Sequence, residues 1–342
     1  MNDTQNVNKS NNAPLVITLV ICLIVLAILV LCVVEKFSQK PDEPVIGDGP
    51  EAQYIELAIS KGMRLNEVKV ILDELEISYE VIPTASKRPN LVENIEYVGK
   101  AENGKLFIEI GSAVKLHANE VSADKIMYLT FDDGPTRDNT LPILDMLEEY
   151  GIAATFFVEG QDVTRFPDRI AQTVAKGHLV GCHSYSHDID DLIYSSTGVF
   201  IDEIEQYEDA MIAAIGEEAF AKMPKVLRFP GGTNNYQLSD EEAVEYIAAV
   251  RGAGYMIYDW TALTNDADNA YRQKGESDLD YFMRSLKSSI ESAKENELPL
   301  IVLMHDKKAM RDCLADVLEY LVGEGYYFDT IDSCPEYTFV ER

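Results

Sequence analysis

The chain of 342 residues is poor in cysteine and in basic side chains, and each shortage excludes a class of protein. Five cysteines are too few for a small scaffold held together by disulfides. Only 29 Lys and Arg stand against 59 Asp and Glu, so the net charge is −30. Such a surface repels nucleic acid and anionic lipid headgroups, and we expect no nucleic-acid partner. The apolar fraction of 46% is that of an ordinary globular protein.

Three of the five cysteines lie outside the apolar stretch near the N-terminus. Cys22 and Cys32 fall inside that stretch and are expected to be free thiols. Cys182, Cys313 and Cys334 are an odd number, so at least one of them stays unpaired. The sequence leaves a Cys313–Cys334 bridge open, because spacing alone does not decide a pairing.

A run of 20 residues, Leu15–Val34, carries no charged side chain. Its length matches the hydrocarbon thickness of a bilayer, so we expect a transmembrane helix after a short tail, residues 1–14. The alternative is a cleaved signal peptide, which needs a shorter apolar core, a basic start and small residues at the cleavage site. Only Lys9 precedes the run as a base, and Leu31 spoils a lipoprotein signal ahead of Cys32, so an uncleaved anchor is favoured.

Residues 35–53 are rich in proline, glycine and charge, which predicts an exposed linker. Lys36 and Lys40 follow the apolar run, and this charge difference by itself favours a cytoplasmic C-terminal part. The difference is small enough for a large translocated domain to override it.

Residues 54–117 have the pattern of a small α+β module. Apolar side chains recur at helical spacing over Met63–Leu75. A helix packed on a three-stranded sheet is a core of reasonable size for such a segment. The expected strands are Ser78–Ile82, Leu91–Val98 and Lys105–Ile110.

This segment resembles a PASTA module, a type that often binds cell-wall peptidoglycan. The likeness rests on Gly62-Met-Arg-Leu-Asn-Glu-Val, on the Tyr79-Glu-Val strand and on the closing Gly104-Lys-Leu-Phe-Ile-Glu-Ile. The alternative is a spacer that holds the following domain away from the membrane.

From Ser122 onward, short apolar runs alternate with amphipathic stretches, which predicts a parallel sheet closed or nearly closed into a barrel. The expected strands are Ile126–Phe131, Ala154–Val158, His178–Gly181, Val226–Phe229, Tyr255–Tyr258, Leu300–Met304 and Tyr326–Phe328. The expected helices are Thr140–Tyr150, Gly198–Ile215, Asp240–Val250, Leu279–Asn296 and Met310–Leu321. In such barrels the reactive side chains gather at the carboxyl ends of the strands.

Two adjacent carboxylates, Asp132 and Asp133, end the first of these strands, and a Gly-Pro turn follows them. On their own they could form an ordinary polar turn. His183 and His187 follow the third strand, four residues apart, which suits two ligands of one ion if the segment turns helically. The chain has only five histidines, so this pair together with the carboxylates favours a metal site.

Further polar side chains follow the later strands. Arg228 leaves the fourth strand and needs a carboxylate partner such as Asp132, and Gly231 in the next turn allows a backbone amide to approach a substrate oxygen. Asp259 follows the fifth strand, where a cap is the bland alternative. His305 ends the sixth strand, where a histidine suits a proton donor.

Five motifs between Thr130 and His305, opening with Thr-Phe-Asp-Asp-Gly-Pro and His-Ser-Tyr-Ser-His, resemble those of the polysaccharide deacetylases with the NodB-homology fold, carbohydrate esterase family four. The resemblance covers residues 122–335, implies a distorted (β/α)7 barrel, and identifies 122–342 as the catalytic domain. Residues that would bind one divalent metal, zinc or else cobalt or another transition metal, are Asp133, His183 and His187.

The same resemblance assigns the remaining roles. Asp132 would be the general base and Arg228 its tether. His305 would be the general acid, paired with Asp259. The Gly231 amide would stabilise the oxyanion, while Trp260 and Leu303 would line the pocket for the acetyl methyl group.

The chain departs from the family pattern at three positions. Cys182 stands where many members carry Asn, Gly231 where many carry an aromatic, and Met256 where many carry Asp or a similar polar residue. None of these replaces a metal ligand or the acid–base pair, so we expect an active enzyme.

The transmembrane anchor, the PASTA-like module and the five motifs together predict N-deacetylation of peptidoglycan N-acetylglucosamine. This reaction is the hydrolysis of a linear amide bond. The alternatives are an O-acetyl esterase of xylan or wall polymers and, in another class, a catalytically silent wall-binding protein. Because the substrate lies in the wall, we expect a single-pass protein of the cell membrane with its catalytic domain outside.

Overall fold

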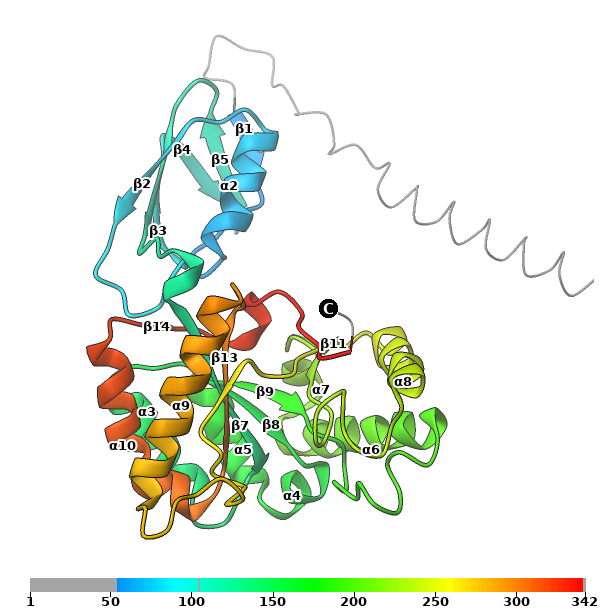
Figure 1. Ribbon diagram of the computed structural model, residues 1–342. Helices are drawn as coiled ribbons and strands as arrows, with labels where there is room; N and C mark the ends of the chain where they lie inside the picture. The colour runs from blue at the N-terminus through cyan, green and yellow to red at the C-terminus, as the bar shows by residue number, and fades with distance from the viewer. Residues whose placement is uncertain (1–53, 104, 341–342) are drawn as a thin grey trace, which may run out of the picture. The chain divides into compact units, whose positions relative to one another are not determined.

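The computed structural model describes residues 54–103 and 105–340 (Figure 1). The predicted anchor 15–34 and linker 35–53 lie outside these residues. Within the described part, no helix has the length and apolar character needed to cross a membrane. The contacts divide the chain into two compact units. Among the described residues, one unit comprises 54–59 and 97–114, and the other comprises 60–96 and 115–340.

The first unit is an antiparallel sheet. Its strands are β1 (Tyr54–Leu57), β5 (Lys105–Glu109) and β4 (Gly99–Glu102), in that order. The register sets Tyr54 opposite Glu109 and Glu102 opposite Lys105. Residues of β4 are all exposed, so this strand carries no apolar alternation by which the sequence could have predicted it.

The second unit begins with α2 (Leu65–Glu74), which lies inside the predicted helix. A second three-stranded sheet follows, with β6 (Val114–Ala118) between β2 (Tyr79–Pro83) and β3 (Val92–Glu96). The prediction of one sheet holding all three expected strands is therefore wrong. Its third strand, β5, pairs elsewhere because β1, β4 and β6 supply partners that the sequence pattern did not predict.

Within this second unit, the segment before β6 makes polar contacts with the large domain. Arg64 forms ion pairs with Asp329 and Asp332. Lys87 Nζ donates to the carbonyl of Tyr150 at 2.8 Å, at the carboxyl end of a helix, where cations are favoured.

The large domain is built on a sheet of eight strands whose order is β11-β10-β9-β8-β7-β13-β12, with β14 paired to β7. All of its pairings are parallel. The strands are β7 (Ile126–Gly134), β8 (Thr155–Val158), β9 (Leu179–Cys182), β10 (Val226–Leu227), β11 (Met256–Ile257), β12 (Ala262–Leu263), β13 (Leu300–His305) and β14 (Tyr327–Phe328).

The sheet is curled but open, so the full barrel that the resemblance implies is corrected to a half-barrel. In the described part of the chain no ladder joins β11 to β12, the two edge strands. Only residues 258–261 connect these edges, and the five Cα–Cα steps from Ile257 to Ala262 span at most about 18 Å. The sheet therefore curls until its edges are near each other, while a peptide segment instead of strand pairing bridges the gap.

Helices cover the convex side of this sheet, with α9 and α10 beside α3, and α6 between α4 and α8 (Figure 1). Their bounds are α3 (Thr140–Tyr150), α4 (Gly160–Arg165), α5 (Pro167–Ala175), α6 (Thr197–Ile215), α7 (Glu217–Phe220), α8 (Asp240–Gly252), α9 (Asp278–Glu295) and α10 (Lys308–Gly323). The predicted helix over Thr140–Tyr150 is confirmed at both ends. Helices α4 and α5 are absent from the predicted helices, because Pro167 interrupts the apolar period. Pro167 occupies the first position of α5, where proline is favoured.

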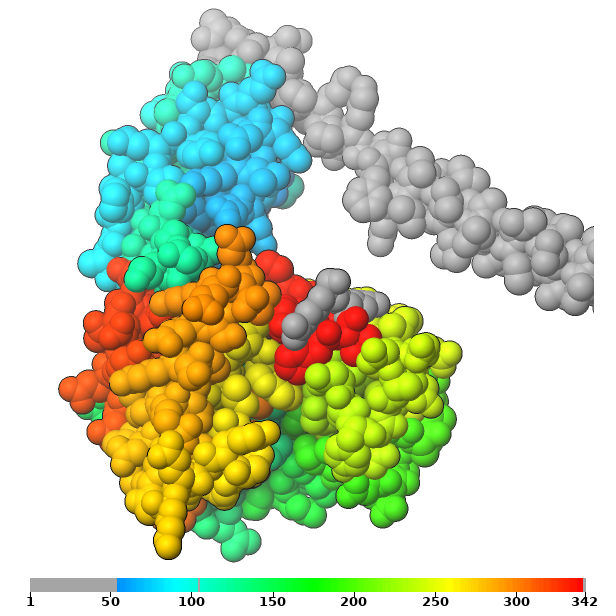
Figure 2. Space-filling view, in the orientation of Figure 1, coloured from blue at the N-terminus to red at the C-terminus, as the bar shows by residue number. Residues whose placement is uncertain are grey.

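The C-terminal residues complete the domain. Tyr337 bridges to Tyr258 in parallel, and Glu336 accepts from the Ile257 amide at 2.7 Å. Figure 2 shows this segment, in red, against the yellow-green surface of α8. Cys313 and Cys334 are separate buried thiols, so the bridge that their spacing left open does not form.

Candidate metal centre and catalytic site

The predicted site residues meet at the carboxyl ends of the central strands. Asp132 and Asp133 lie at the end of β7, His183 directly follows β9, and Arg228 directly follows β10. His305 ends β13, and in the ladder it lies opposite Asp132. Parallel strands deliver these side chains to one edge of the sheet, as the sequence predicted.

Asp133, His183 and His187 form a group that could hold a metal ion. Their ligand atoms all lie within 4.8 Å of one another. Asp133 Oδ1 is 3.6 Å from His183 Nε2 and 3.5 Å from His187 Nε2. One carboxylate and two imidazoles are a known ligand set for catalytic zinc, which leaves a coordination position open. The residues present therefore fit one divalent transition metal.

His183 is fixed in the tautomer that metal binding requires. Its Nδ1 is 2.9 Å from the carbonyl oxygen of Arg228, so Nδ1–H donates and Nε2 keeps its lone pair toward Asp133. Burial lowers the pKa of His183 to about 4, since a charged imidazolium is poorly solvated there. The neutral form is the one that ligates metals.

The backbone conformation of Asp133 and an ion pair with Lys307 orient its carboxylate. Its φ of 64° lies in the left-handed region, which directs the carboxylate away from the strand direction. Lys307 Nζ lies 2.9 Å from Asp133 Oδ2, so Oδ1 is the oxygen left for the two histidines. Burial raises the pKa of Asp133, but His183, His305 and Lys307 outweigh it and hold that pKa below its usual range.

Asp132 is not a member of the metal group, and Arg228 holds it. The guanidinium Nη1 donates to Asp132 Oδ1 at 2.9 Å. The other oxygen, Oδ2, lies 3.7 Å from His183 Nε2 and so faces the metal group. The predicted pairing of Arg228 with Asp132 is confirmed.

Arg228 is completely buried, with 0% of its surface exposed, and all of its groups have partners. Nε donates to the carbonyl of Tyr258, Nη1 also donates to Thr130 Oγ1, and Nη2 donates to the carbonyl of Asp259. The ring of Phe157 lies 4.4 Å from the guanidinium carbon. A buried charge with so many partners fixes Asp132 rigidly.

The partner of His305 is Asp266, and the predicted pair with Asp259 is wrong. Asp266 Oδ1 lies 3.1 Å from His305 Nδ1, and Oδ2 accepts from the His305 amide at 2.9 Å. Burial lowers the pKa of His305, but the hydrogen bond and charge of Asp266, with Asp133 and Asp132, outweigh it and raise that pKa. His305 is thereby favoured in its protonated form.

Asp259 instead anchors the loop after β10. Its carboxylate accepts from the Thr233 amide at 2.9 Å, from the Thr233 hydroxyl and from the Phe339 amide at 2.7 Å. These three donors occupy most of the roughly four acceptor positions of the carboxylate.

The predicted pocket residues Trp260 and Leu303 are packed against neighbouring side chains and strands. Trp260 packs edge-on against Phe339, with centroids 5.0 Å apart, and its ring lies 5.8 Å from the Arg228 guanidinium carbon. Leu303 is buried in β13 beside Thr130 of β7. Gly231 is exposed and has a φ of 77°, a conformation that favours glycine.

Three residues of the site are absent from the predicted set: Asp266, Lys307 and Asp306. Asp306 is fully buried and accepts from the hydroxyls of Thr136 and Thr140, which fixes the turn after Asp133. Its position directly after His305 was a usable signal. Asp266 gave none, because it lies in a loop after a two-residue strand that the sequence pattern did not reveal.

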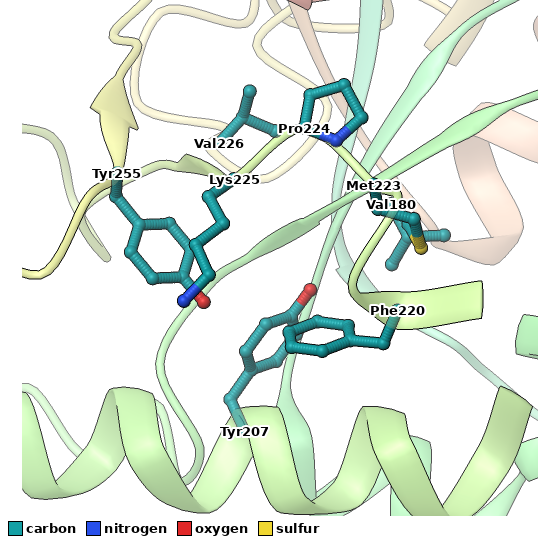
Figure 3. A pocket seen from close by; sticks show the side chains of 8 residues that line it. All are labelled: Val180, Tyr207, Phe220, Met223, Pro224, Lys225, Val226 and Tyr255. Atoms are coloured by element: carbon teal, nitrogen blue, oxygen red, sulfur yellow. The ribbon is translucent and has the colours of Figure 1, made fainter. Parts of the chain in front are cut away.

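A cavity on the flank of the sheet is too small to be the substrate site. It lies between α6 and the strands β9 and β10 and measures about 10 Å³, room for about one water molecule (Figure 3). Its lining is largely apolar and comprises Val180, Tyr207, Phe220, Met223, Pro224, Lys225, Val226 and Tyr255.

The known proteins that this chain resembles are polysaccharide deacetylases. Residues 119–248 match the family model of the polysaccharide deacetylases. A peptidoglycan-N-acetylglucosamine deacetylase of Bacillus cereus is 25% identical over 280 residues, which cover 79% of this chain and 93% of that protein. The corresponding enzyme PgdA of Listeria monocytogenes is 31% identical over 223 residues, which cover 65% of this chain but only 41% of its own.

Solved structures give the same fold. The catalytic domain of a peptidoglycan N-acetylglucosamine deacetylase from Eubacterium rectale is 29% identical, with a TM-score of 0.51 over 64% of this chain and 90% of its own. A CE4 esterase of Streptococcus mutans is 25% identical, with a TM-score of 0.53 over 60% of this chain and 86% of its own.

The fold and the site thus define an α/β domain of the NodB type with a curled parallel sheet. Residues 119–248 match the polysaccharide deacetylase family, and the chain is similar to peptidoglycan N-acetylglucosamine deacetylases. The enzyme class predicted from the motifs is confirmed, since polysaccharide deacetylases are hydrolases of amide carbon–nitrogen bonds.

Proposed function

We propose that this chain removes acetyl groups from an acetylated amino-sugar polymer, peptidoglycan N-acetylglucosamine, and releases acetate. The observation that carries the proposal is that the two adjacent aspartates have different partners. Asp133 faces both histidines, whereas Asp132 lies outside that group with one oxygen free of its arginine.

Zinc held by Asp133, His183 and His187 would polarise the acetyl carbonyl and lower the pKa of a water molecule. Asp132 Oδ2 accepts the proton of that water, because Arg228 occupies only Oδ1. The Gly231 amide adds a donor for the negative charge that develops on the carbonyl oxygen.

His305 completes the reaction by protonating the leaving amine. Asp266 holds the proton on Nδ1, so the donated proton comes from Nε2. The raised pKa of His305 favours the protonated form that a proton donor needs. Trp260 and Leu303 line the pocket for the acetyl methyl group.

The test is acetate release from purified peptidoglycan. We expect release by the wild type, loss on removal of metal by a chelator and recovery on addition of zinc. Asp132→Ala should abolish release while metal binding persists. Mass spectrometry of muropeptides then assigns each lost acetyl to its sugar. No acetate from any acetylated glycan would refute the proposal.

An O-acetyl esterase is the second candidate, because a CE4 esterase has the same fold. An alkoxide leaves more readily than an amine and depends less on a proton donor. A His305→Ala variant that keeps its rate on acetylated xylan and loses it on peptidoglycan would separate the two activities.

We further propose that Leu15–Val34 anchors the chain in the cell membrane with the catalytic domain on the wall side, and that the segment 54–117 contacts the wall. The support is the length of the apolar run and the PASTA-like motifs. Membrane fractionation with protease protection tests the anchor. Retention of a full-length Asp132→Ala chain on sacculi, against a chain with residues 54–117 replaced by a flexible linker, tests wall contact.

A further inference from the structure

The loop that carries both histidines has an unfavourable backbone. Ser184 has a φ of 64° and His187 a φ of 58°, both in the left-handed region that residues other than glycine rarely adopt. In this conformation of the loop, His187 Nε2 lies 3.5 Å from Asp133 Oδ1. Something outside the loop must therefore hold it in place.

Glu203, on the first half of α6, binds the amides of this loop. Its Oε2 accepts from the Tyr185 amide at 3.0 Å, from the Ser186 amide at 2.7 Å and from the Ser186 hydroxyl at 2.9 Å. These donors lie between the two histidines. Glu203 is only 3% exposed.

Nothing in the packing of the core requires a carboxylate at this position. In the described part of the chain, no lysine, arginine or histidine forms an ion pair with Glu203, so loop donors alone compensate its charge. Burial of a charged carboxylate without a cationic partner costs free energy. The presence of Glu203 at this position indicates that the loop donors require it. An apolar side chain would fill the same space and leave both loop amides without a partner.

The start of α4 holds the opposite side of the loop. The Gly160 amide donates to the carbonyl of Ser184 at 3.1 Å, and Gln161 donates to the carbonyls of Tyr185 and Ser186, each at 3.0 Å. A side chain at Gly160 would meet Tyr185 at 2.4 Å, so only glycine lets the helix approach this closely. Carbonyls of the loop are thus bound by α4 and its amides by Glu203.

We infer that Glu203 is a positioning residue of the metal centre: its carboxylate fixes the loop 184–187 and thereby sets the distance of His187 from His183 and Asp133. The inference rests on the proposed metal site. It predicts that Glu203 controls metal affinity and geometry without touching the ion or the substrate.

The experiment compares Glu203→Gln with Glu205→Gln, which removes the same charge from an exposed position on the same helix. Zinc affinity is measured by competition with a chelating dye, and cobalt-substituted protein is examined by its visible absorption. We expect Glu203→Gln to bind zinc about 10- to 100-fold more weakly, the usual cost of losing an outer partner of a metal ligand, and to shift the cobalt bands. Glu205→Gln should match the wild type in both.

Ser186→Ala provides a milder variant should Glu203→Gln fail to fold, because it removes one of the three donors and leaves the charge buried. We expect a weaker loss of zinc affinity than with Glu203→Gln, and a less than additive loss in the double variant, since both changes break the same contact. Zinc affinity and cobalt spectra equal to the wild type in folded Glu203→Gln, or in Ser186→Ala alone, would overturn the inference. A wild-type chain that binds no metal would instead refute the proposed function.

Discussion

The metal group and the proton-donor pair occupy the same edge of the sheet but are assembled in different ways. His183 and His187 lie four residues apart on one loop, and Asp133 ends the strand next but one. His305 and Asp266 are separated by 39 positions, and they meet only because β12 and β13 pair. A ligand set with short spacing can therefore be predicted from the sequence, whereas a pair that is distant in sequence can be predicted only when the strand order is known.

The two groups also differ in how they are held. Asp133 and His187 have left-handed backbones, which are stabilised by Lys307 and by Glu203 with α4. His305 continues a regular strand, and Asp266 binds both its ring and its amide. The metal group therefore depends on a strained loop, and the donor pair on an ordinary ladder.

The largest effect is expected from removing a ligand of the metal group. His183→Ala should reduce acetate release by about a thousandfold or more, equal to about 4 kcal/mol of transition-state stabilisation, and should abolish zinc binding. Zinc content after dialysis and kcat/KM are the measurements. His117→Ala, in the sheet β2-β6-β3, is the control and should retain both. A fully active His183→Ala protein would contradict the metal site.

Breaking the donor side should cost somewhat less and should leave metal binding intact. His305→Ala is expected to lower kcat on an N-acetyl substrate by about 10²- to 10⁴-fold, the usual contribution of a positioned acid. Zinc affinity should change little, because His305 is not a member of the metal group. Loss of zinc in this variant would show that the two groups are not separate.

The identity of the partner carboxylate is tested by Asp266→Asn against Asp259→Asn. Loss of the Asp266 charge lowers the pKa of His305, so the alkaline limb of the kcat/KM profile should move to lower pH. Asp259→Asn should leave that limb in place and instead lower thermal stability, since it weakens the contacts with Thr233 and Phe339. The opposite pattern would restore the pairing predicted from the sequence.

The smallest effect is expected from Lys307→Met. Lys307 is 45% exposed, so its ion pair with Asp133 contributes only about 0.2–1 kcal/mol. Removal of a positive charge beside the ligand should tighten zinc binding up to about fivefold, measured at low ionic strength. Lys308→Met, whose ion pair is with Asp312, is the neighbouring control and should not change the affinity.

Much of the large domain could be predicted, because parallel strands are buried on both faces and appear as apolar runs. All seven expected strands overlap observed strands, and four of them cover the observed strand completely. The strands β7, β9 and β13 extend past their predicted ends, β13 by one residue to include His305. The strand β12 is two residues long and gave no pattern. Because β12 was not predicted, the loop that carries Asp266 could not be placed beside His305, and the partner of His305 was predicted wrongly.

The sequence by itself determined the chemistry of the metal group, since Asp-Asp at a strand end and His-x-x-x-His carry their meaning in short spacing. It also determined the ion pair of Arg228 with Asp132, because a buried cation needs a carboxylate partner. Only the tertiary structure decided which aspartate serves His305 and which residue holds the histidine loop. The physical reason is that Asp266 and Glu203 act through hydrogen bonds to distant backbone amides and side chains, and such partners are set by how strands and helices pack.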